Sequence, residues 1–136
     1  MHTNRWLYLI TAVLIALFIY TAVSKIIDFN TYTDQMRNQP LPRWLTVVLI
    51  WAVPLMEILA STLLLLDGSR HLGFVLSFSL LLSFTIYVGL ILSGTFRYVP
   101  CSCAGIFSSM GWQTHLYVNL LFTTLAGLGL VGVTRR

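Results

Sequence analysis

Charged residues are scarce in this chain of 136 residues: eight Lys or Arg and four Asp or Glu make up 9% of it. Soluble domains carry about a quarter charged residues, so this chain has too few to cover a water-facing surface. Hydrophobic residues account for 57%, and the mean hydropathy is +0.85. The basic residues form no run beyond the pair at 135–136, so nothing supports nucleic-acid binding. The composition therefore predicts a protein whose main solvent is lipid.

Four apolar segments are each long enough to cross a bilayer. A helix needs about 20 apolar residues to span the hydrocarbon core, and open strands cannot satisfy their backbone in lipid. Trp6, Trp44 and Trp112 lie near segment ends, as is typical of interfacial aromatic residues. We therefore predict an all-α membrane protein, with one four-helix transmembrane domain over residues 1–136. The predicted spans are residues 6–23, 44–66, 72–92 and 116–133.

An even number of spans places both termini on the same side of the membrane. The connections 25–43 and 93–114 then share the opposite side, and the short turn 67–71 makes the middle helices an antiparallel hairpin. Four Lys or Arg lie on each side, so the positive-inside rule gives no orientation. Paired thiols are most useful on the oxidising side. This favours a bacterial inner-membrane protein with cytoplasmic termini and a periplasmic cysteine connection.

Cysteine is scarcer still: Cys101 and Cys103 are the only two in the chain, one residue apart in a short polar connection after Pro100. A disulfide closing so small a ring would be strained and easily reduced, and it would constrain little of the unfolded chain. We predict redox or metal chemistry here rather than two inert small residues. Two thiolates fall short of a zinc site, although a linear two-thiolate Cu(I) site remains an alternative.

Glu57 is the one ionisable residue deep inside a predicted span, about 20 Å along the helix from Trp44. Two interpretations have equal weight: a carboxyl that handles protons or contacts quinone, or a protonated carboxyl hydrogen-bonded to hydroxyls. Lys25 either extends to the interface, the commoner case, or turns inward toward Glu57 or a ligand. Asn119, expected one turn into the last helix, should bond a neighbouring helix. The candidate hydroxyl partners of the carboxyl are Ser61, Thr62, Ser83 and Thr85.

Several stretches together resemble a known family. The run "YTAVSKIIDFNTYTDQM", followed by "LPRWL" and "VPLMEILASTLLLL", resembles the DoxX-like membrane proteins. The run "PCSCAGIFSSMGWQTHLYVNLLF" is similar to their MauE branch, named for methylamine utilisation. The resemblance covers nearly the whole chain, and its most specific residues are Cys101, Cys103, Gly105 and Asn119. It implies a redox-associated bundle like that of vitamin K epoxide reductase.

The resemblance implies that the protein forms or relays disulfides outside the cytoplasm, with a thioredoxin-like partner and with quinone as a candidate cofactor. Those bundle enzymes commonly use Cys-x-x-Cys and a second thiol pair, whereas this chain has Cys-x-Cys and no second pair. A partner would therefore exchange directly with Cys101 or Cys103, which we predict as the catalytic residues. The predicted quinone or ligand contacts are Glu57, Lys25 and Asn119.

Two other functions remain open. One is a non-catalytic membrane anchor or assembly subunit of a larger envelope complex, whose cysteines would be inert. The other is a carrier of a small molecule or metal ion that uses Glu57 and the thiols.

Overall fold

The computed structural model describes residues 2–94 and 111–135, and within them every regular element is a helix. Four of these helices are long and apolar enough to cross a membrane. The predicted all-α, multi-pass membrane fold is therefore confirmed, with spans at Arg5–Ile27, Arg43–Leu65, Asp67–Leu92 and Trp112–Thr134. The elements in chain order are α1 (His2–Ile27), α2 (Phe29–Arg37), α3 (Arg43–Leu65), the 3₁₀ turn η1 (Asp67–Ser69), α4 (Arg70–Leu92) and α5 (Trp112–Thr134).

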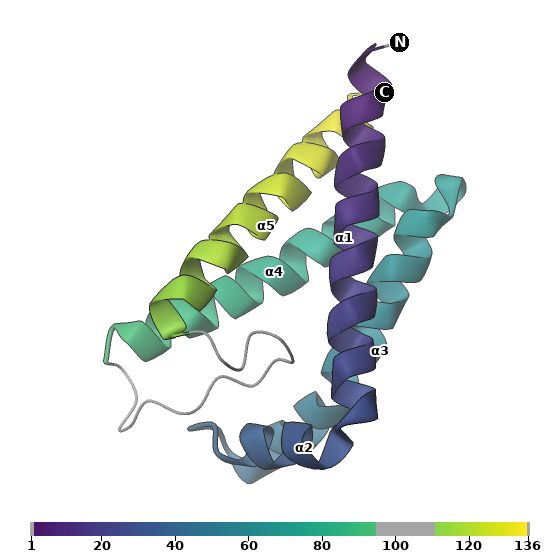
Figure 1. Ribbon diagram of the computed structural model, residues 1–136. Coiled ribbons are helices and arrows are strands. Elements are labelled where there is room, and N and C mark those ends of the chain that lie inside the picture. The colour runs from purple at the N-terminus through teal and green to yellow at the C-terminus, as the bar shows by residue number, and fades with distance from the viewer. Residues whose placement is uncertain (1, 95–110, 136) are drawn as a thin grey trace.

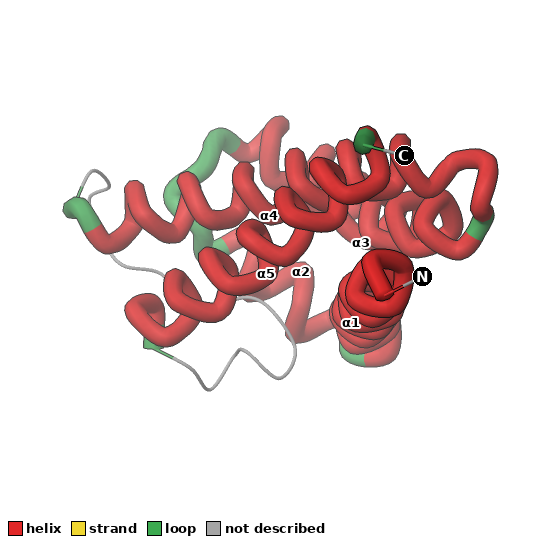
Figure 2. The backbone as a smooth tube through the Cα atoms, turned by 90° about the horizontal axis from the view of Figure 1, so that it is seen from above, coloured by secondary structure: helices red, strands yellow, loops and turns green. Residues whose placement is uncertain are grey.

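The long helices are arranged as two packed pairs, α1 with α3 and α4 with α5, joined by contacts between α3 and α4 (Figure 1). Both termini lie at one end of the molecule, as the even number of spans predicts. The opposite end holds α2, the end of α4 and the start of α5, and is called the α2 end below. Figure 2 shows α1 nearly end-on while α4 and α5 extend sideways, so the two pairs diverge.

The connection between the first two spans contains a helix, α2, that the sequence analysis does not predict. Its first turn is capped by the Asp28 carboxylate, which accepts a hydrogen bond from the backbone N–H of Thr31 at 3.4 Å. Tyr32 and Met36 are four residues apart, so both face inward and pack against Ile50 of α3. Because α2 is only nine residues long and mostly polar, a search for apolar spans misses it.

Close helix packing depends on residues without side chains. A Cβ built at Gly129 of α5 would lie 2.2 Å from the ring of Phe74 in α4. One built at Gly73 of α4 would lie 2.7 Å from the backbone nitrogen of Leu64 in α3. Phe74 and Leu64 are fully buried in the main core cluster. Small residues therefore allow the close approach of α4 to both neighbours, as is common between membrane helices.

Candidate functional site

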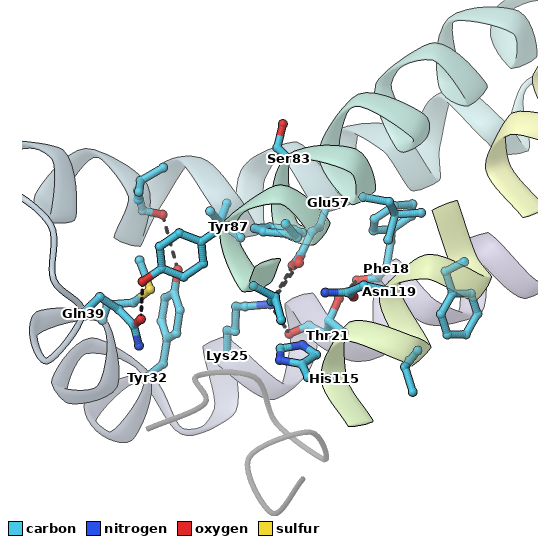
Figure 3. A pocket seen from close by; sticks show the side chains of 18 of the residues that line it. Phe18, Thr21, Lys25, Tyr32, Gln39, Glu57, Ser83, Tyr87, His115 and Asn119 are labelled. Atoms are coloured by element: carbon cyan, nitrogen blue, oxygen red, sulfur yellow. Dashed lines mark hydrogen bonds and ion pairs between the residues drawn. The ribbon is translucent and has the colours of Figure 1, made fainter. Parts of the chain in front are cut away.

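A cavity of about 400 Å³ lies between α1, α3, α4 and α5 and reaches the α2 end, where Tyr32 and Met36 line it. Most of its wall is apolar, with Phe18, Leu81 and Phe122 among the lining side chains. The cavity occupies the region where the two helix pairs diverge. The polar lining side chains labelled in Figure 3 are Thr21, Lys25, Tyr32, Gln39, Glu57, Ser83, Tyr87, His115 and Asn119.

The centre of the cavity wall is a buried ion pair between α1 and α3. Lys25 Nζ donates to Glu57 Oε1 at 2.9 Å and to Oε2 at 3.2 Å (Figure 3). It also donates to the backbone carbonyl of Thr21 at 3.5 Å, so all three ammonium hydrogens have an acceptor. Lys25 is 7% exposed and Glu57 is 2% exposed. Of the two predicted orientations of Lys25, the inward one is therefore found, and the extension to the interface is not.

The four hydroxyls predicted as partners of Glu57 donate elsewhere, and the carboxylate is paired with Lys25 instead. Each hydroxyl donates to the backbone carbonyl four residues earlier in its own helix, which is how Ser and Thr are commonly satisfied in apolar helices. Because that carbonyl is always within reach, such a hydroxyl needs no partner across the bundle. The donor distances are 3.0 Å for Ser61, 2.9 Å for Thr62, 2.7 Å for Ser83 and 2.7 Å for Thr85.

Asn119 lies about two turns into α5, deeper than predicted, because the helix begins already at Trp112. Its side chain is 8% exposed, lines the cavity and points toward the ion pair (Figure 3). Within the described residues its Nδ2 has no hydrogen-bond partner. The predicted bond from this amide group to a neighbouring helix is thus not found. The helix-to-helix hydrogen bond here joins the hydroxyls of Thr85 and Thr123, 3.1 Å apart.

The α2 end of the cavity is lined by residues that the sequence analysis did not select. The hydroxyl of Tyr87 in α4 donates to Gln39 Oε1, and Gln39 Nε2 donates to the carbonyl of Gln35 at 3.2 Å. The Tyr32 hydroxyl donates to the carbonyl of Leu49 at 3.3 Å, which ties α2 to α3. The four-residue spacing of Tyr32 and Met36 could have predicted that both face inward. No sequence pattern pointed to Gln39.

The first turn of α5 also belongs to the wall. Trp112 and His115 line the cavity, and their rings lie 5.8 Å apart with an angle of 35° between them. In the sequence, the stretch that carries the cysteines precedes this cavity-lining turn. Cys101 and Cys103 themselves lie outside the described residues.

Three of the five predicted site residues, Lys25, Glu57 and Asn119, thus line one cavity although they come from three different helices. Their role as ligand contacts stays a prediction. What the arrangement offers chemically is an apolar chamber with a neutralised charge pair and an amide donor.

Comparison with known proteins agrees with the family resemblance of the sequence motifs. No curated protein and no solved structure matches the chain significantly. The model of one family, described as methylamine utilisation protein MauE, matches residues 3–132, which is nearly the whole chain. This multi-pass membrane protein therefore belongs to the MauE family of methylamine utilisation proteins.

Proposed function

We propose that the protein is a membrane accessory factor that supports thiol–disulfide exchange, or disulfide maturation, of a partner outside the cytoplasm. The proposal rests on the place of the Cys-x-Cys pair in the sequence, in the stretch that joins α4, which ends at Leu92, to α5, whose first residue Trp112 lines the cavity. Membership of a family named for methylamine utilisation supports an accessory role at the membrane. The broader DoxX-like relationship, an inner-membrane location and cytoplasmic termini are parts of the same proposal.

The exchange is a pair of thiolate displacements. A thiolate of a thioredoxin-like partner attacks the Cys101–Cys103 disulfide, which forms a mixed disulfide and releases one cysteine of this chain as a thiol. The second partner thiol then attacks the mixed disulfide, so the partner leaves oxidised and this chain holds two thiols. Two electrons and two protons have moved to the cysteine pair. Passing them to a quinone, which becomes hydroquinone, would regenerate the disulfide.

The two cysteines should have unequal roles. Cys103 is followed by the small residues Ala104 and Gly105, whereas Cys101 follows Val99 and Pro100, so we assign Cys103 as the thiol that meets the partner. In Cys101→Ser, the Cys103 thiolate can attack the disulfide of the oxidised partner, which releases one partner thiol and forms a mixed disulfide. No second thiol of this chain can resolve that bond, so it should accumulate as a reducible band on a non-reducing gel.

The matched control is Cys103→Ser, which should accumulate less of that band. Trapping the thiols with an alkylating reagent, with and without a reductant, should show a redox state that follows the conditions. A membrane-impermeant thiol reagent should label the reduced pair in intact spheroplasts. If the double Ser variant matures the partner as well as the wild type does, the hypothesis of thiol–disulfide exchange is wrong. The chain is then better explained as an anchoring subunit.

A further inference from the structure

The charges lining the cavity neutralise each other. Lys25 is the one Lys or Arg, and Glu57 the one Asp or Glu, among the described lining residues. Both carboxylate oxygens already accept from the same ammonium group. Among these described lining residues, an amine would therefore find no open carboxylate, and an anion would find no open cation. No group of three His, Cys, Asp or Glu side chains in the described parts of the chain lies close enough together to hold a metal ion. The preferred occupant is a neutral molecule.

An unpaired hydrogen-bond donor in the wall narrows the chemistry of the occupant further. The Asn119 side chain is more than nine-tenths buried, and its Nδ2 lacks an acceptor anywhere in the described structure. Buried donors without partners are rare because their desolvation is not compensated. The amide faces the cavity rather than a packed helix (Figure 3). An occupant that supplies an acceptor oxygen would satisfy it.

The volume and the lining of the cavity define the size and the polarity of the occupant. The volume of about 400 Å³ falls within the range of small-molecule sites, roughly 300–1,000 Å³. The wall that surrounds the polar centre is mostly built from Leu, Val and Phe side chains contributed by all four spans, and at the α2 end Met36 lies among Tyr32, Gln39 and Tyr87. The body of the occupant should accordingly be apolar, with its oxygen at one end.

We propose that this cavity binds a neutral, largely apolar molecule whose carbonyl oxygen accepts a hydrogen bond from Asn119 Nδ2. A quinone ring with an apolar tail has this chemistry, and so does the ester group of a lipid. The Lys25–Glu57 pair lies beside this oxygen, at the polar centre of the cavity wall. Binding itself does not require the thiols; only the use of a bound quinone as electron acceptor rests on the proposed function.

The test uses the purified full-length protein in detergent, with 2-decyl-1,4-benzoquinone as the probe. Trp112 lines the cavity, so a bound quinone should quench its fluorescence saturably, above the unsaturable quenching by quinone dissolved in the micelle. Asn119→Leu should raise the apparent Kd about 3- to 10-fold, the usual effect of one hydrogen bond, and Asn119→Gln should restore part of the loss. Asn30→Leu, which removes an exposed amide outside the cavity, is the matched control and should bind as the wild type does.

Competition experiments against the bound quinone then distinguish a quinone site from a lipid-ester site. Decylbenzene, which lacks a carbonyl, and methylammonium should displace the quinone poorly. Methyl laurate competing as well as the quinone would identify a lipid ester as the natural occupant, and weaker competition would identify a quinone. Equal binding by Asn119→Leu and wild type, or equal competition by decylbenzene, would overturn the proposal. The Cys101→Ser, Cys103→Ser double variant should still bind the quinone, so a failure of the thiol hypothesis is distinguishable from a failure of this one.

Discussion

Separating the charges of the buried ion pair is the most informative perturbation of this protein. Lys25 and Glu57 are 7% and 2% exposed, and the ammonium contacts both carboxylate oxygens, at 2.9 and 3.2 Å. Removing one partner leaves the other charge buried and uncompensated, which typically costs about 3–5 kcal/mol. We expect Lys25→Met and Glu57→Leu each to lower the free energy of unfolding by an amount in this range. Glu57→Gln keeps an acceptor oxygen for the ammonium, so it should cost less than Glu57→Leu.

The double variant Lys25→Met with Glu57→Leu gives the decisive comparison. Replacing a whole buried pair by apolar side chains is often neutral or stabilising, so the double variant should be more stable than either single variant. A double-mutant cycle, measured by titrating the protein from mild into denaturing detergent, should give a coupling free energy of about 3 kcal/mol or more.

The exposed pair Asp34 and Arg37, 4.0 Å apart on α2, is the matched control for this cycle. Its side chains are 73% and 69% exposed, so its coupling should stay below about 0.5 kcal/mol. If the losses from the Lys25 and Glu57 single variants simply add in the double variant, the two groups do not interact. The reasoning about the ion pair would then be refuted.

Two further predictions concern helix packing. Gly129→Ala should destabilise the protein by about 1–3 kcal/mol, because the new Cβ would collide with the Phe74 ring, whereas Gly68→Ala, with open space around it, should be nearly neutral in the same detergent titration. Thr123→Val keeps the side-chain shape but removes the 3.1 Å contact with Thr85, so it should cost about 0.6 kcal/mol, the average for hydrogen bonds between membrane helices; a loss above about 2 kcal/mol would mean that the hydroxyl has another role.

The membrane fold was predictable from the sequence because it follows from a local property. Twenty or so apolar residues have few alternatives to a spanning helix in lipid, so the four spans follow from hydropathy alone. The limits of the spans were less predictable. The last helix begins at Trp112 rather than near residue 116, because the turn "WQTH" is too polar for a hydropathy criterion although it is helical.

The contacts within the site depend on how distant segments pack, which sequence patterns do not encode. Glu57 could be selected because a carboxyl at that depth needs a partner. Pairing with Lys25, 32 residues away, could be predicted only as one of two alternatives, because nothing local decides whether its side chain turns inward. Gln39 and Tyr87 gave no signal, because their pairing depends on where α2 lies against α4. Asn119 was selected, but the helix-to-helix bond expected of it is made by Thr123 instead.

The ion pair has a consequence for alignment as well as for stability. Apolar packing alone does not fix the depth or the rotation of a helix that has apolar side chains on most of its surface. Many positions of such a helix against its neighbour bury a similar area. Sliding α1 by one residue moves Lys25 by about 1.5 Å along the helix axis and turns it by about 100°, away from Glu57. Misaligned arrangements of α1 and α3 would therefore leave both charges in an apolar environment. We expect the pair to select one register from many of similar packing energy, a role best attested for buried polar residues in coiled coils. Singly charged variants that still insert into the membrane should accordingly show several helix arrangements in cross-linking between α1 and α3, where the wild type shows one.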